Sequence, residues 1–247
     1  GSGEGMVGLS GPAHLFLGQD RMCLEGNCRG LDNIAFQSGR CWPSDLALWD
    51  LGGKITGQPV WKLLGGRNDR VPAYASSGTL RGPDALADAA DAYIARGFRA
   101  LKVRFHRGDW HDDIAALAAV RARVGDRLTL MVDCNQGWRM PWDTAPPWTL
   151  KDAVAVAREL ERLDVYWMEE PLHRGDREGM RRLREATDVR IAAGEMTREL
   201  YEFRDLIVDG AADIVQPDAA PVGRITGLRP LAVSLMGHGT RSTPQPQ

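Results

Sequence analysis

After residue 70 of this 247-residue chain, short β-like runs alternate with helical runs, and charged residues stand at the ends of several β-like runs. The alternation predicts an α/β fold with a parallel sheet. The charged strand ends favour a (β/α) barrel of the TIM type, because barrel enzymes carry their functional groups on that rim. Residues 1–70 are instead rich in glycine and turn-forming residues, so we predict an appended domain at residues 1–70 and a barrel at residues 71–247.

In the appended domain, residues 44–52 and 60–64 have the apolar spacing of helices, and Ser44 is placed to cap the first one. The predicted strands of the barrel are residues 71–75, 100–104, 128–133, 165–169, 190–194, 213–216 and, at the end of the chain, 240–243. The predicted helices between them are residues 84–96, 112–124, 150–163, 177–186, 200–209 and 226–235. Each helical run repeats apolar residues three or four positions apart, which is the period of a half-buried helix.

An open, doubly wound sheet begins with the same alternation, so the motifs decide between the two folds. A dinucleotide-binding sheet carries G-x-G-x-x-G directly after its first strand. No such motif follows residues 71–75, and the glycine pair of GGRND at residues 65–69 precedes that strand. The barrel is therefore the preferred prediction.

The charge composition indicates a small-molecule partner. The 31 basic and 33 acidic residues give a net charge of −2 and form no basic stripe, so we expect neither a nucleic-acid nor a membrane partner. We also expect a homo-oligomer. The chain has no apolar run of transmembrane length and no signal-peptide pattern at residues 1–11, which favours the cytoplasm. Its 4 cysteines form no CxxC pair, so we expect reduced thiols and no zinc cluster.

Three acidic residues, Asp133, Glu169 and Glu195, end successive predicted strands. In a parallel barrel these strand ends meet on one rim, and three carboxylates crowded there are unfavourable unless a cation neutralises them. Mg²⁺ fits best, because a few carboxylates leave coordination positions for water and an anionic substrate. The alternative is that each acid pairs with a neighbouring Lys or Arg on a solvated rim.

Six strings of residues carry a family resemblance. They are ALWDLGGKITGQPVWKLLGG at residues 47–66, LKVR at 101–104, VDCNQGW at 132–138, WMEEPL at 167–172, AAGE at 192–195 and QPDAAPVGRITG at 216–227. Together and in this order, they resemble the enolase superfamily and, within it, the mandelate racemase and muconate lactonizing enzyme family. The resemblance spans nearly the whole chain and implies a modified (β/α)7β barrel with a partial α+β capping domain at residues 1–70. It also implies that the barrel is incomplete at its C-terminal end.

The resemblance implies that Asp133, Glu169 and Glu195 are the Mg²⁺ ligands, with Asn135 and Glu170 in or near the surrounding shell. Such a site stabilises the enolate that forms when a base removes the proton next to a substrate carboxylate. We therefore expect a small-molecule carboxylate substrate and a Mg²⁺-dependent lyase, most simply an acid-sugar dehydratase. A racemase or epimerase is the alternative enzyme, and a metal-binding homologue without catalysis is the third interpretation.

The second predicted strand departs from the family pattern, which is commonly KxK or KxH. Here the motif is KVR, with Lys102 expected to contact the substrate carboxylate and Arg104 in the place of the base. Arginine is a poor proton acceptor and a good anion clamp, so we interpret Arg104 as a binding group. The alternative for Arg104 is a rim ion pair with Glu195 or Asp133.

The opposite face of the substrate is expected to be served by an Asp–His dyad. Asp218 matches its aspartate, but the partner position falls near Gln245, where the family usually has histidine. His238 is interpreted as structural, while His106 and His111 follow the second predicted strand and could approach the site. An insertion, RMPWDTAPPWT at residues 139–149, cannot continue a helix and is expected to form either a rim loop near the substrate or a plain surface loop.

Overall fold

The structure is a computed structural model and describes residues 16–20, 23–38, 42–141, 143–218, 225–226, 228 and 241–242. Its strands are β1 (Ala75–Ser76), β2 (Ala100–Arg104), β3 (Thr129–Asp133), β4 (Val165–Glu169), β5 (Arg190–Ala193), β6 (Ile214–Val215) and β7 (Arg241–Ser242). All are parallel, and each is hydrogen-bonded to the next in the order β1 to β7. A doubly wound sheet reverses its strand order and a barrel does not, so the observed order favours the predicted barrel.

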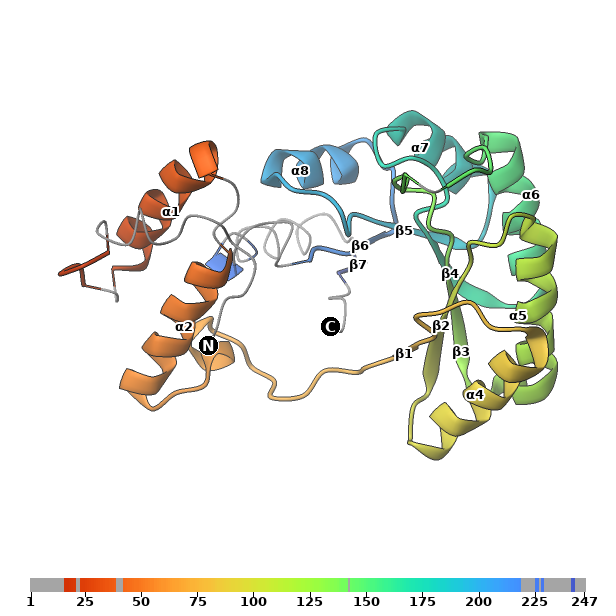
Figure 1. Cartoon of the computed structure of the whole chain (residues 1–247), viewed down its shortest axis with the longest axis horizontal. Helices are drawn as coiled ribbons and strands as arrows, with labels where there is room; N and C mark the ends of the chain where they lie inside the picture. Colours follow the sequence, from red (N-terminus) through yellow and green to blue (C-terminus); the bar gives the residue numbers. More distant parts are fainter. Residues whose placement is uncertain are drawn as a thin grey trace.

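Helices connect these strands and also form the N-terminal part of the chain (Figure 1). They are α1 (Leu24–Ser38), α2 (Trp42–Thr56), α3 (Val60–Leu63), α4 (Pro83–Ala95), α5 (Trp110–Val124), α6 (Leu150–Arg162), α7 (Arg177–Ala186) and α8 (Leu200–Val208). Of the helix predicted at residues 226–235, only 226 and 228 are described, and both are helical. Among the described helices, none combines the length and apolar character needed to cross a membrane.

The structure differs from the sequence predictions at three places. Helix α1 is not predicted by its sequence pattern, because Gly26, Asn27 and Gly30 have weak helical propensity. Helix α2 begins at Trp42, so Ser44 lies within the helix and is not its cap. The strand predicted at residues 71–75 is reduced to β1, because Pro72 has no backbone N–H to donate to a neighbouring strand.

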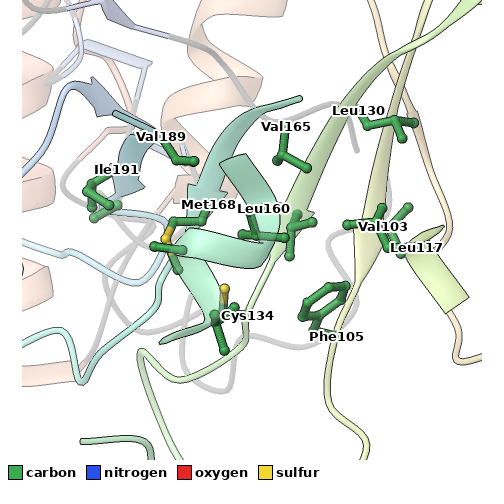
Figure 2. Close-up of a cluster of buried hydrophobic side chains, with 14 of the residues drawn as sticks. Val103, Phe105, Leu117, Leu130, Cys134, Leu160, Val165, Met168, Val189 and Ile191 are labelled. Carbon is green, nitrogen blue, oxygen red and sulfur yellow. The ribbon is translucent and has the colours of Figure 1, made fainter. Parts of the chain in front are cut away.

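The main core lies between the sheet and the helices that follow its strands (Figure 2). Side chains alternate along β2 and the residue after it: Val103 and Phe105 are fully buried in this core, which also contains Leu117 of α5 (Figure 2). Burying each such side chain contributes roughly 1.5–3 kcal/mol. Because successive side chains of a strand point to opposite faces, this packing directs Lys102 and Arg104 to the other face of the sheet.

A second, smaller cluster of buried side chains forms on that other face. It consists of Tyr74, Met131, Trp167, Ala192 and Ile214. Met131, Trp167 and Ala192 each precede, by two or three positions, one of the predicted carboxylates at the strand ends. The ring of Tyr74 packs edge-on against that of Trp167, with 5.6 Å between centroids. This cluster therefore forms an apolar layer beneath the strand-end residues, as in other filled barrels.

Helix α2 is tied to the C-terminal part of the chain by a buried polar network, which Figure 1 locates where a blue helical turn lies beside α2. The Thr226 hydroxyl donates to Asp45 Oδ1 at 2.8 Å and accepts from Trp49 Nε1 at 3.0 Å. The Thr226 backbone N–H donates to Asp45 Oδ2 at 3.3 Å. Both Asp45 and Trp49 are buried, so their polar atoms depend on this threonine.

We predict that Thr226→Val lowers the free energy of unfolding by about 1–3 kcal/mol, because it leaves a carboxylate oxygen and an indole N–H buried without partners. Urea denaturation measures this loss. Thr226→Ser keeps the hydroxyl and is the matched control, with a smaller expected loss. Equal losses in the two variants would mean that the hydroxyl network does not hold α2.

Candidate metal centre

The structure brings Asp133, Glu169 and Glu195 together. Asp133 ends β3, Glu169 ends β4, and the two residues face each other in the strand register. Glu195 follows β5, whose Ala192 is paired with Glu169. One carboxylate oxygen from each of the three lies within 4.8 Å of the others. The sheet thus places at one point three acids that are far apart in the sequence.

Lys102 of β2 is the buried cation of this cluster. Its Nζ lies 2.9 Å from both carboxylate oxygens of Glu169 and 3.6 Å from Oδ2 of Asp133. Glu169 itself is 0% exposed. Burial alone would lower the pKa of Lys102, but the charges of Glu169 and Asp133 raise it above its ordinary value. Lys102 is therefore held protonated beside the carboxylates.

The remaining acids are strongly perturbed. Burial, followed by the charge of Glu169, raises the pKa of Asp133 to about 6 and that of Glu195 to about 7. Burial, followed by the charges of Asp133, Glu195 and Glu169, raises the pKa of Glu170 to about 8. One lysine thus does not offset the crowded negative charge. Oxygen ligands converging with excess negative charge are the donor set of a hard divalent cation, so these residues fit Mg²⁺.

Asn135 and Glu170 frame the cluster from strained backbone positions. Their φ angles are 51° and 47°, in the left-handed region that few residues other than glycine adopt. The Asn135 side chain donates to the carbonyl oxygens of Phe105 at 2.8 Å and Asp133 at 3.0 Å, which joins the ends of β2 and β3. The Glu170 backbone N–H donates to the carbonyl oxygen of Ala192 at 2.9 Å and so ties the end of β4 to β5.

Gly137 is a site residue that sequence reasoning missed. A Cβ atom at this position would lie 2.4 Å from the carboxylate carbon of Glu170, closer than any side chain could be placed. The glycine therefore leaves the space that the Glu170 side chain occupies. The signal was present in the string NQGW, where a glycine directly follows two polar residues at a strand end.

Arg104 lies on β2 opposite Asp133 in the strand register. Its backbone N–H donates to the Ser77 hydroxyl at 2.9 Å. Its guanidinium forms no ion pair with Asp133 or Glu195 in the described part of the chain, so the alternative of a rim ion pair is not observed. Its position opposite Asp133 places it near the cluster, and its positive charge acts to lower the pKa of Asp133.

The two histidines after β2 are bound to aspartates on the outer loops. His106 Nε2 is hydrogen-bonded to Asp143 Oδ1 at 2.8 Å, and His111 Nδ1 to Asp109 Oδ1 at 2.6 Å in an exposed pair at the start of α5. Asp218 lies just beyond β6. His238 and Gln245 lie outside the described residues, so the dyad partner stays a prediction.

The insertion at residues 139–149 folds against the loop between β2 and α5. Asp143 anchors the insertion, because its carboxylate is hydrogen-bonded to His106 and accepts a hydrogen bond from the Met140 backbone N–H at 2.7 Å. The insertion borders a pocket of about 580 Å³ whose lining includes His106, Trp110, Gln136, Asp143 and Trp148. The insertion is thus anchored beside a pocket, and its predicted closeness to the substrate stays a prediction.

The parallel β/α sheet is that of a barrel protein. The carboxylates and the buried lysine at the C-terminal ends of its strands form the kind of acidic centre that binds a metal ion. The family model described as enolase C-terminal domain-like matches residues 85–245. The chain belongs to the enolase superfamily, in the mandelate racemase and muconate lactonizing enzyme family. The resemblance and the barrel fold predicted from the sequence are thereby confirmed.

Three relatives illustrate the likeness. The chain is 36% identical over 189 residues to 3,6-anhydro-alpha-L-galactonate cycloisomerase of Streptomyces coelicolor, covering 76% of this chain and 50% of the relative. It is 35% identical over 204 residues to L-talarate/galactarate dehydratase of Salmonella typhimurium, covering 82% of this chain and 49% of the relative. The crystal structure of L-talarate dehydratase from Polaromonas sp. JS666 complexed with Mg and L-glucarate matches with a TM-score of 0.84 and 34% identity. The match covers 95% of this chain and 66% of that one. The chain thus spans about half the length of the curated relatives it matches.

Proposed function

We propose that the protein is a Mg²⁺-dependent enzyme that removes the proton next to the carboxylate of an acid sugar and acts as a dehydratase. The observation that carries this proposal is the convergence of Asp133, Glu169 and Glu195: one carboxylate oxygen of each lies within 4.8 Å of the others, and the buried Lys102 contacts two of these acids. The names of the relatives support the substrate class, because they include acid-sugar dehydratases. The bound Mg in the Polaromonas structure supports the choice of metal.

In this proposal Asp133, Glu169 and Glu195 hold the ion, which when bound supplies positive charge for the enolate that forms on the substrate. Lys102 is buried and protonated, so it is suited to bind a substrate carboxylate or a developing oxyanion. Arg104 provides a second cation on the same strand and acts as an anion clamp. Glu170 and Asn135 keep the strand ends in place, and Asp218 serves the opposite face of the substrate.

Incubation with a panel of acid sugars in deuterated water, with and without Mg²⁺, tests the reaction. Dehydration gives a 2-keto-3-deoxy acid. Racemisation or epimerisation, the second candidate, exchanges the α-proton for deuterium and retains the substrate. Absence of both reactions with Mg²⁺ present would contradict the enzyme proposals.

The third candidate, a metal-binding homologue without catalysis, is favoured by one specific observation: Arg104 stands where the family commonly has a lysine or histidine base. Titration calorimetry distinguishes this case, because Mg²⁺ and a carboxylate would bind without exchange of the α-proton.

We predict that Arg104→Lys raises KM by roughly 10-fold and leaves the pH dependence of turnover unchanged. Lysine keeps the charge but loses the two-pronged geometry with which arginine holds a carboxylate. Steady-state kinetics across a pH series measures both quantities. A displaced pH profile with an unchanged KM would instead identify Arg104 as the base, since lysine gives up its proton more readily.

A further inference from the structure

Gln216 is the least expected polar residue of the centre. It directly follows β6 and is 0% exposed. Its side-chain Nε2 donates to Glu169 Oε2 at 2.9 Å, across 47 positions of sequence. Its Oε1 is also buried and has no hydrogen-bond partner among the described residues. A buried amide with one satisfied end and one unsatisfied end requires an explanation.

The orientation of this amide follows from the chemistry of its neighbour. Reversing the amide would bring Oε1 against a carboxylate oxygen, and two acceptors without a hydrogen between them repel each other. The donor must therefore face Glu169, even though no described residue then donates to Oε1.

Two of the partners of Glu169 differ in charge. Lys102 contacts both of its oxygens at 2.9 Å and brings a positive charge, whereas Gln216 contacts Oε2 and brings none. A cation that binds Glu169 is repelled by the charge of Lys102 but only weakly affected by a neutral amide. Gln216 can therefore keep the carboxylate oriented while a cation is bound, which a second lysine in its place could not.

We propose that Gln216 is a positioning residue that orients Glu169 for the divalent cation and thereby sets the metal affinity of the centre. It acts through Glu169 and not on the substrate. The inference rests on the proposed metal site and adds a residue to it.

The test is titration calorimetry of the full chain with Mn²⁺ and with Mg²⁺. Gln216→Met keeps the length of the side chain and removes the donor. We expect it to weaken metal binding by roughly 10–100-fold, the usual effect of losing a partner that orients a metal ligand. Circular dichroism and thermal denaturation without metal establish that the variant is folded. If Gln216→Met does not fold, Gln216→Asn, whose shorter amide withdraws the donor from Glu169, is measured in its place with the same expectation.

Gln136→Met is the matched control. Gln136 is also a buried glutamine just beyond a strand end, but its side chain binds the Cys134 carbonyl oxygen and the Trp148 backbone N–H and contacts no carboxylate of the centre. We expect this control to lose stability and to keep its metal affinity within about 3-fold, far less than the loss expected when a ligand's orienting partner is removed. A general effect of removing a buried amide would weaken metal binding in both variants alike and would overturn the proposal.

The metal affinity of the unaltered protein separates the two proposals. If the unaltered protein binds neither ion, the proposed metal site is wrong. If it binds the ions and Gln216→Met binds them equally well, the site stands and the role assigned to Gln216 is wrong.

Discussion

Replacing Asp133 with asparagine is expected to lower the affinity for Mg²⁺ by roughly 100-fold or more and to reduce turnover at least in proportion. Outer residues that only orient a ligand already account for about 10–100-fold, and Asp133 supplies both an oxygen and a charge. Asparagine has nearly the same shape as aspartate, so the substitution removes the charge with little change in packing. Because the pKa of Asp133 is raised by burial and by Glu169, losing its charge should not destabilise the metal-free protein. Calorimetry with Mg²⁺, together with urea denaturation in EDTA, measures both effects.

Asp213→Asn is the control for Asp133→Asn. Asp213 precedes β6 at the opposite end of the sheet, where its carboxylate binds Arg184 and the backbone N–H of Ile191. Its replacement should lower stability and leave Mg²⁺ affinity unchanged. Unaltered Mg²⁺ binding in Asp133→Asn would remove Asp133 from the ligand set and with it the central assignment.

The second large effect concerns pH. In the absence of metal, we expect the free energy of unfolding to fall between about pH 4 and pH 8. The pKa values of Asp133, Glu195 and Glu170 are raised to about 6, about 7 and about 8, whereas unfolded carboxyl groups titrate near 4. Throughout this range the folded protein binds more protons than the unfolded chain, so raising the pH favours unfolding. The loss should be on the order of a few kcal/mol, since one pKa unit corresponds to about 1.4 kcal/mol.

Saturating Mg²⁺ should reverse much of this slope, because a divalent cation stabilises the ionised carboxylates that the empty cluster disfavours. Urea denaturation at several pH values, in EDTA and in excess Mg²⁺, makes the comparison. In Asp133→Asn the slope in EDTA should be shallower, which assigns part of it to this cluster. Parallel pH profiles in EDTA and Mg²⁺ would show that the ion does not bind at these acids.

The elements of the barrel could be predicted because their signals are local. Alternation of apolar residues marks β2 and β4 at their observed bounds, and helical spacing marks α7 in the same way. The position of each acid at a strand end, together with the parallel direction of the strands, was enough to expect Asp133, Glu169 and Glu195 on one rim. β1 was misplaced because hydrophobic pattern alone does not account for the N–H that Pro72 lacks.

The sequence by itself was enough to predict the order of strands and helices, the family and the three acids at the strand ends. The element and motif signals lie in short segments, and the parallel direction of the strands puts their carboxyl ends on one rim. Only the tertiary structure decided which partners hold those acids. The hydrogen bond of Gln216 to Glu169 spans 47 positions, and that of Thr226 to Asp45 spans 181. The space beside Gly137, in the loop after β3, is likewise defined by Glu170, which directly follows β4. Such contacts depend on how the sheet curves and closes, and no periodicity along the chain records that geometry.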